Sequence, residues 1–374
     1  MLVQESEQIH TVTITGYASG GEGVARLGNG RVAFIRNAAR GDVLRVKPTK
    51  IGERSVSAEI ADIVTPSPHR IEPDCPHYLE CGGCDFRHIT YGEELEAKLQ
   101  RVNDAIKRIG GLSIQADEIL STGQVDGYRN KAVFHSDGKS LGFYQSRSHD
   151  VIRIDRCLLL KDDINDAIKT LSHALHKGET TLRSGLNGLA EPFEEELDGL
   201  DFTIEGFFQV NKDAALLLYQ KVREYADLSK SEMLIDMYCG VGSMTLFAGR
   251  DAGHALGVEQ NEEAVKAARE NALRNSLSHI EFVSADAALW DAGNRKPDCV
   301  IVDPPRKGLS TGAVKKILDL APKRIVYASC DPATLARDLK ALHGYETTKI
   351  CAVDMFPRTA NVECCCMLNR VFER

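Results

Sequence analysis

From Met233 onward the sequence alternates short apolar runs with helical patterns, and this alternation constrains the fold more than any other feature. The segments that show it are MLIDMYCGVGSMTLFAG, HALGVEQNEEAVKAARENAL, IEFVSADAAL, CVIVDPPRKG and RIVYASCDPATLARDL. Strands that alternate with helices in this way form a parallel sheet with helices on its faces. We therefore expect a doubly wound α/β unit of Rossmann-like architecture in this part of the chain.

The ends of the first three predicted strands carry residues that suit a nucleoside ligand. Asp236, Gly240 and Gly242 lie between the first strand and a helix, where glycines let the backbone approach a ligand. Glu259 ends the second strand and can accept both hydroxyls of a ribose, and Asp286 after the third can meet an adenine amino group. The glycine turn lacks the full G-x-G-x-x-G pattern, which disfavours a dinucleotide.

The fourth and fifth strand ends carry a carboxylate and a thiol. The stretch VDPPRKG holds Asp303 in a rigid, extended turn that faces the same pocket. Amino-group methyltransferases with such a turn usually have an aromatic residue where Arg306 stands, and RNA cytosine-C5 methyltransferases have a cysteine in the turn, which is absent here. Cys330 ends the fifth strand, before a helix whose positive end would favour the thiolate.

A thiol in this position suits the methylation of carbon 5 of a uracil. A thiolate that adds to carbon 6 turns the base into an enolate, whose carbon 5 can attack a methyl sulfonium. A base then removes the proton of carbon 5, and the thiol leaves by elimination. Glu363, next to the apolar C-terminal strand, is our candidate for that base.

The first half of the chain has different patterns. Residues 11–64 alternate apolar and polar residues in short runs punctuated by glycines, which predicts a small β-barrel of five strands. The proline-rich stretch TPSPHRIEPDCP follows as a linker, and a helix is expected before Gly110 and Gly111. The apolar face of this helix comprises Leu95, Leu99, Val102 and Ile106.

The cysteines suggest a metal centre. There are 11 of them, an odd number, and the N-terminal stretch MLVQESEQIH has neither a basic leader nor an apolar core, so we expect reduced thiols in a cytoplasmic protein. Cys75, Cys81 and Cys84 have a C-x5-C-x2-C spacing and, with the remote Cys157, suit a four-cysteine site. The spacing alone does not separate a [4Fe–4S] cluster from structural zinc. It differs from the C-x3-C-x2-C pattern of radical chemistry on S-adenosylmethionine.

The charge of the chain limits how it can bind nucleic acid. The formal net charge is -8 at pH 7, which opposes a protein-wide electrostatic attraction to RNA or DNA. RNA binding would therefore depend on local groups. No apolar run is long enough to span a bilayer, so we expect no membrane association.

Five stretches give the chain a resemblance to a known family. FFQVN, DMYCGVGS, VDPPRKG, YASCDPATLARDL and DMFPRTANVE together resemble the RNA (uracil-5-)-methyltransferase family, especially its 23S ribosomal RNA members. The resemblance covers essentially the whole chain, and the N-terminal module resembles the TRAM domain, an OB-like RNA-binding barrel. The chain departs from the family at Asn361, where histidine is usual, and at the three cysteines Cys364–Cys366, where aliphatic residues are usual.

The resemblance implies roles for individual residues. Cys330 would be the nucleophile and Glu363 the base, with Asp303 between cofactor and uracil. Phe207 would stack on a flipped uridine, and Arg129 and Lys131 of YRNKAVF would contact RNA. The implied contacts of S-adenosylmethionine are Gln209, Tyr238, Gly240, Gly242, Glu259, Asp286 and Asp303. The implied ligands of a [4Fe–4S] cluster, which the resemblance favours over zinc, are Cys75, Cys81, Cys84 and Cys157.

We therefore predict a monomeric enzyme of three parts. These are a TRAM-like β-barrel (1–66), a central α+β domain with the four-cysteine site (67–205) and a class I methyltransferase domain (206–374). The predicted reaction is methylation of uridine carbon 5 in RNA, with 23S ribosomal RNA as the expected substrate. The alternatives are a tRNA uridine-54 C5 methyltransferase, a non-catalytic RNA-binding protein and a radical methylase.

Overall fold

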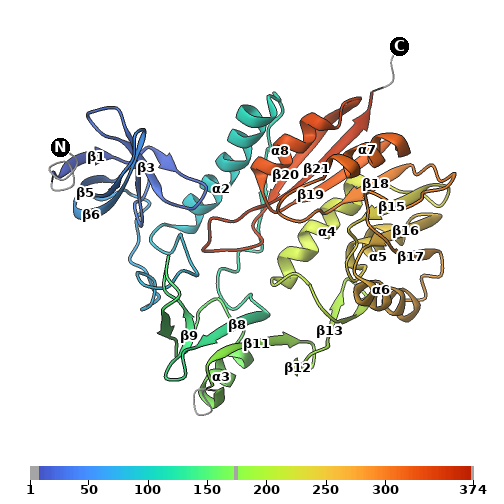
Figure 1. Ribbon diagram of the computed structural model, residues 1–374, viewed down its shortest axis with the longest axis horizontal. Helices are drawn as coiled ribbons and strands as arrows, with labels where there is room; N and C mark the ends of the chain where they lie inside the picture. Colours follow the sequence, from blue (N-terminus) through green and yellow to red (C-terminus); the bar gives the residue numbers. More distant parts are fainter. Residues whose placement is uncertain (1–7, 172–175, 372–374) are drawn as a thin grey trace.

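The computed structural model describes residues 8–171 and 176–371 (Figure 1). Its N-terminal part is a sheet of six strands, drawn in blue in Figure 1. These strands are β1 (His10–Thr13), β2 (Gly16–Tyr17), β3 (Gly23–Arg26), β4 (Val32–Ile35), β5 (Val43–Ile51) and β6 (Ser55–Thr65). They lie in the order β1-β5-β6-β4-β3-β2 around a small apolar core. The sequence led us to expect five strands; the sixth is the two-residue β2, which pairs with β3.

A long helix follows the linker. Helix α2 (Tyr91–Ala105) starts at Thr90, whose side chain accepts a hydrogen bond from the Glu93 N–H. It continues as the π-helix Ile106–Gly110 and ends at Gly111, which has a left-handed backbone (φ 68°) that glycine adopts without strain. The helix therefore ends where the glycine pair predicts.

The central part of the chain forms a second sheet, of five strands in the order β10-β9-β8-β11-β12. Helix α3 (Asp162–Leu171) lies beside it in Figure 1, and a separate hairpin of two strands follows. The strands of the sheet are β8 (Lys131–Ser136), β9 (Leu141–Tyr144), β10 (Val151–Arg153), β11 (Gly178–Gly185) and β12 (Gly188–Leu189). The hairpin consists of β13 (Phe193–Leu197) and β14 (Leu200–Ile204).

The C-terminal part is built on an eight-stranded sheet in the order β17-β16-β15-β18-β19-β21-β20-β7. The five strands β17, β16, β15, β18 and β19 run parallel to one another, and β21 is antiparallel to β19. The strands are β7 (Ile119–Leu120), β15 (Met233–Met237), β16 (His254–Glu259), β17 (Ile280–Ser284), β18 (Cys299–Val302), β19 (Arg324–Ser329), β20 (Tyr345–Val353) and β21 (Glu363–Arg370). The parallel, Rossmann-like sheet predicted from the sequence is thus confirmed.

Helices cover both faces of this sheet. They are α4 (Lys212–Ala226), α5 (Ser243–Gly249), α6 (Glu262–Arg274), α7 (Thr311–Leu320) and α8 (Pro332–Ala341). Leu234 of β15 packs in the core with α4, α5 and α6, whereas the next residue, Ile235, packs with α2, α7 and α8. Adjacent strand residues point to opposite faces, so both faces of the sheet are buried. Within the described ranges, no helix combines the length and the apolar character needed to cross a membrane.

Residues expected in the central domain also build this C-terminal unit. Val102 and Ala105 of α2 belong to one of its two cores, and β7 pairs with β20 at the edge of its sheet. The three-domain division at 66 and 205 stays a prediction.

A buried ion cluster joins α2 to the segment before β21. The Lys98 ammonium donates to Glu94 Oε1 (2.7 Å), to Asp354 Oδ1 (2.6 Å) and to the carbonyl of Phe356 (3.1 Å). Glu94 and Asp354 are fully buried, and Glu94 Oε1 also accepts the Arg358 N–H at 2.7 Å. This cluster fixes the chain that leads into Glu363, so we name it the Lys98 cluster.

We expect Lys98→Met to destabilise the protein by about 3–5 kcal/mol, because it removes the cation that two buried carboxyl groups share. Urea unfolding measures the loss at pH 7. The loss should be smaller below pH 6, since burial raises the pKa of Glu94 to about 6 and its protonated form needs no cation.

The matched control is Lys315→Met, which breaks an exposed pair of Lys315 and Asp319 at 2.7 Å. Such pairs contribute less than about 1 kcal/mol. Equal losses for the two variants would contradict a structural role of the Lys98 cluster.

Candidate active site

Polar side chains gather where the parallel strands of the C-terminal sheet end. Glu259 is the last residue of β16, and Asp303 and Cys330 directly follow β18 and β19. Asp286 lies two residues beyond β17. The carboxyl ends of parallel strands meet at one edge of a sheet, which is where ligands bind in open α/β folds. The residues predicted at the ends of these four strands are thus brought to one edge.

The glycine turn after β15 has a backbone conformation that lets a ligand approach it closely. Gly240 has φ 54° and Gly242 has φ 83°, and even Tyr238 between strand and turn has φ 73°. A Cβ on Gly242 would lie 2.8 Å from the ring of Phe282, so a larger residue does not fit there. The Gly240 N–H donates to Glu259 Oε2 at 3.1 Å, which ties the turn to the end of β16.

A small cavity of about 60 Å³ opens beside this turn. Its walls include Gln209, Tyr238, Gly240 and Asp303 of the predicted cofactor set, together with Phe207. Pockets that enclose a small molecule measure roughly 300–1,000 Å³, so this cavity can hold only part of such a ligand. Glu259, Asp286 and Gly242 of the predicted set are not among its walls. Sequence reasoning missed Tyr219 and Ser243, whose hydroxyl groups lie 3.1 Å apart in the wall of this cavity.

Three carboxyl groups at this edge are protonated more readily than usual. Burial raises the pKa of Asp303 to about 7 and that of Asp236 to about 7. Burial also raises the pKa of Glu363, the first residue of β21, to about 8, and the charge of Asp303 adds to this while Arg306 opposes it. Carboxyl groups with such pKa values can exchange protons near neutral pH.

The Cys330 thiol is half-buried just before α8, whose positive end we expected to favour the thiolate. Burial acts against that effect: it raises the pKa of Cys330 to about 11, and the charges of Glu363 and Asp303 raise it further. A helix N-terminus contributes only about 0.3–1 kcal/mol, which is too little to offset burial and two carboxylates. Arg306 is the cation that lowers the pKa of this thiol.

Helix α8 also holds the Asp-Pro-Pro turn that contains Arg306. Asp338 Oδ2 accepts the Leu309 N–H and the Tyr327 hydroxyl, both at 2.7 Å. The Thr334 hydroxyl donates to the carbonyl of Arg306 at 3.2 Å. Sequence reasoning missed Asp338, although a carboxylate among the apolar residues of a helix was a usable signal. These contacts fix the turn relative to Cys330.

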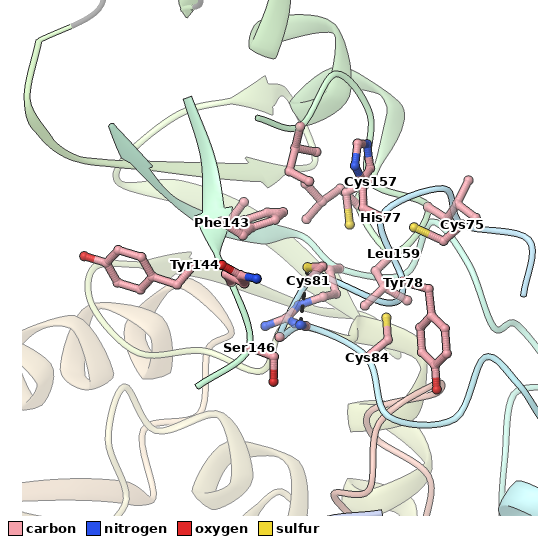
Figure 2. A pocket seen from close by; sticks show the side chains of 18 of the residues that line it. Cys75, His77, Tyr78, Cys81, Cys84, Phe143, Tyr144, Ser146, Cys157 and Leu159 are labelled. Atoms are coloured by element: carbon pink, nitrogen blue, oxygen red, sulfur yellow. Dashed lines mark hydrogen bonds between the residues drawn. The ribbon is translucent and has the colours of Figure 1, made fainter. Parts of the chain in front are cut away.

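The four predicted ligand cysteines line one cavity of about 650 Å³ in the central part of the protein. In Figure 2 the sulfur atoms of Cys75, Cys81, Cys84 and Cys157 face a common space. The Gly83 N–H donates to the sulfur of Cys81 at 3.4 Å. Across residues 8–171 and 176–371, no three His, Cys, Asp or Glu side chains are grouped to hold a single metal ion.

The predicted RNA contacts fall in two places. Phe207 is 75% exposed at the rim of the small cavity, so its ring is open to a ligand. Arg129 and Lys131 instead lie along the wall of the cysteine cavity.

Comparisons with known proteins agree with this architecture. The family profile of the TRAM domain matches residues 5–61, that of the methyltransferase small domain matches residues 208–327, and that of tRNA (uracil-5-)-methyltransferase matches residues 291–371. An uncharacterized RNA methyltransferase of Clostridium tetani is 32% identical, with 95% of each chain covered. One of Bacillus cereus is also 32% identical, with 94% of each chain covered.

A solved structure is similar over nearly the whole chain. It is the tRNA (uracil-54, C5)-methyltransferase of Pyrococcus abyssi in complex with S-adenosyl-L-homocysteine. The two structures have a TM-score of 0.77 and 25% sequence identity, with 96% of this chain and 100% of that chain covered.

We expect Arg306→Met to raise the pKa of Cys330 further, because it removes a cation that stabilises the thiolate. Alkylation of Cys330 by iodoacetamide at pH 9, followed by mass spectrometry of the peptide, should slow by about threefold to tenfold. Lys307→Met removes the neighbouring charge and is the control. Equal rates for Arg306→Met and the wild type would contradict this role of Arg306.

Proposed function

We propose that this chain, which belongs to the RNA (uracil-5-)-methyltransferase family, methylates carbon 5 of a uridine in 23S ribosomal RNA through a covalent adduct with Cys330. The family membership makes the chain an RNA-methylating enzyme that uses S-adenosylmethionine and carries an RNA-binding TRAM domain. The choice of RNA, the covalent route, the roles of single residues and the iron–sulfur cluster are proposals.

One observation carries the proposed chemistry: a thiol and two carboxyl groups lie at the ends of neighbouring strands. Cys330 follows β19, and Glu363 begins β21 where Ser329 of β19 pairs with Cys364. Asp303 follows β18, the neighbour of β19 on its other side. The charges of Glu363 and Asp303 both raise the pKa of Cys330, as expected for groups at one edge of the sheet. A nucleophile with an acid–base group beside it is the arrangement that covalent catalysis needs.

The first proposed step is addition of Cys330 to the base. The thiolate would form a bond between its sulfur and carbon 6 of uracil, and the electron pair of the C5–C6 bond would move into an enolate. Arg306 supports this step because its charge favours the thiolate. Phe207, which is exposed at the rim of the cavity, would stack on the flipped uridine.

The last step would depend on Glu363. Once carbon 5 carries both its proton and the new methyl group, the Glu363 carboxylate would take that proton. The electron pair left on carbon 5 restores the C5–C6 bond and expels the sulfur of Cys330. Glu363 is buried, so water does not compete with its carboxylate for this proton.

The residues at the strand ends suit the methyl donor. S-adenosylmethionine would supply the methyl group and a positive sulfonium charge beside acidic groups. We propose that Glu259 accepts the ribose hydroxyls and that Asp286 binds the adenine amino group, since both lie at the ends of neighbouring strands. The other proposed contacts are Gln209, Tyr238, Gly240, Gly242 and Asp303.

We propose that the four cysteines hold a [4Fe–4S] cluster. All four line one cavity of about 650 Å³, which leaves room for a cluster between them. The hydrogen bond from Gly83 to the Cys81 sulfur is of the kind that tunes such clusters. Cys75, Cys81, Cys84 and Cys157 would hold the cluster, which would stabilise this part of the fold.

Transfer RNA is the second candidate substrate. The similar solved structure is that of an enzyme acting on uracil 54 of tRNA. The N-terminal barrel and the four-cysteine set are the features that favour ribosomal RNA by family resemblance. Mapping 5-methyluridine in ribosomal and transfer RNA from cells that lack this protein separates the two substrates.

We expect Glu363→Gln to accumulate a covalent protein–RNA adduct and to lower the methylation rate by about 10²–10⁴-fold. The adduct would persist because the proton of carbon 5 is not removed and the sulfur cannot leave. Denaturing gels measure the adduct, and labelled S-adenosylmethionine measures 5-methyluridine. Cys330→Ala should give neither product.

Glu346→Gln is the control for Glu363→Gln, since Glu346 is an exposed acid on the neighbouring strand β20. Undiminished 5-methyluridine with Cys330→Ala would falsify the covalent route. An adduct with that variant would mean that another residue is the nucleophile.

We expect the purified protein to hold about four iron and four sulfide per chain, and Cys81→Ala to lose most of both. Metal analysis and the visible absorption of the cluster provide the readout. Cys366→Ala removes a buried strand thiol and is the control. Zinc in place of iron would contradict the cluster.

A further inference from the structure

Two cationic side chains lie next to each other on neighbouring strands of the central sheet. Lys131 of β8 is paired directly with Arg183 of β11 in the antiparallel ladder. Side chains of directly paired residues lie on the same face, and like charges in such a pair are destabilising. The repulsion between these two charges therefore lowers the stability of the folded protein.

Arg183 is the more costly of the two because it is buried. It is 3% exposed, and its Nε and Nη1 have no hydrogen-bond partner. Its guanidinium lies 4.8 Å from the ring centre of Phe193, and it forms no ion pair within residues 8–171 and 176–371. A buried cation without a partner carries a large desolvation cost. Buried donors that lack a partner call for an explanation, and an anionic ligand would supply one.

The surrounding charges do not neutralise the pair. Burial lowers the pKa of Arg183 and of Lys131, and the charge of Arg183 lowers that of Lys131 further. Glu191 is the acid that acts on both, and it is exposed to solvent. Lys131 borders the cysteine cavity, whereas Arg183 is not among the residues that line it. The buried member of the pair therefore lies outside that cavity.

The pair lies close to the proposed uridine site. Asn130 connects three segments: its N–H donates to the Val210 carbonyl (2.9 Å), its Nδ2 to the Gln209 carbonyl (3.2 Å), and its own carbonyl accepts the Ser184 N–H (2.8 Å). Adjacent strands are about 4.8 Å apart, so β11 lies about 10 Å from the segment that contains Gln209. Figure 1 shows β8 and β11 side by side.

We propose that Arg183 and Lys131 form a binding site for a backbone phosphate of the RNA strand that carries the target uridine. This rests on the proposed function. The planar guanidinium offers parallel N–H donors that match two phosphate oxygens, and Lys131, only partly buried, adds a point charge on the open side. A phosphate near the exposed Phe207 would hold the strand while the base is turned out.

The test compares RNA binding by four variants: Arg183→Gln, Arg183→Lys, Lys131→Gln and the control Lys139→Gln. Lys139 is an exposed lysine in the turn between β8 and β9. The probe is an unmodified 23S ribosomal RNA transcript, and its Kd is measured over a range of salt concentrations. Arg183→Gln should weaken binding by about tenfold or more and reduce the slope of log K against log salt by about 0.7–0.9.

Lys131→Gln should weaken RNA binding less than Arg183→Gln does. Arg183→Lys should bind RNA more tightly than Arg183→Gln, because it keeps the positive charge but lacks the paired N–H donors of the guanidinium. Thermal melting distinguishes binding from a structural role. Because Arg183 is a buried cation without a partner, its replacement by Gln should leave the melting temperature unchanged or raise it. A lower melting temperature together with unchanged RNA affinity would overturn the proposal.

The other anion within reach is the carboxylate of the methyl donor. Binding of S-adenosylhomocysteine should be unaffected in all four variants, and its loss in Arg183→Gln would overturn the phosphate assignment. A loss of RNA affinity as large in Lys139→Gln would overturn it as well. Failure of the proposed function is measured in a separate assay. In that case the wild-type protein would make no 5-methyluridine, whatever RNA affinity the variants have.

Discussion

The buried ammonium of Lys98 is the contact on which the proposed catalytic edge of the C-terminal sheet depends. It joins Glu94 on its own helix to Asp354, 256 positions later in the chain. The segment that follows Asp354 is held again when Asp85, next to Cys84, accepts the Ala360 N–H at 2.9 Å. Glu363 therefore takes its position from α2 and from the cysteine segment as well as from its own strand. A change at either place reaches the proposed base through short, rigid contacts.

Much of the fold could be predicted because its signals are local. Apolar runs that alternate with helical patterns predicted the parallel sheet, and the edge of that sheet follows from where each run stops. Asp303 and Cys330 were found in this way, since each directly follows a strand. The small N-terminal β-barrel was predicted from the alternation of its strands, and its likeness to the TRAM domain came from the family resemblance. The two-residue strand β2 was missed because two residues give no period.

The rest depends on contacts between residues far apart in the sequence. Periodicity placed Leu95 and Leu99 on the buried face of α2, but in the structure both are only partly buried, and Glu94 and Lys98 are more deeply buried than either. The reason is an acid on a loop beyond β20, which no local pattern reveals. The burial of Cys330 was missed for the same reason. The helix end was visible in the sequence, whereas the burial and the two facing carboxylates were not.

The position of β7 has a consequence for how the chain is made. β7 pairs with β20, and β21 lies between β20 and β19, so this side of the sheet cannot form before the last strand exists. At about 5–20 residues per second, a ribosome needs on the order of ten seconds or more to make the intervening chain. During that time β7 has no partner strand, and β19 is a second open edge from the time it is made until β21 follows. This side of the sheet therefore closes only when the last strand of the chain has been made.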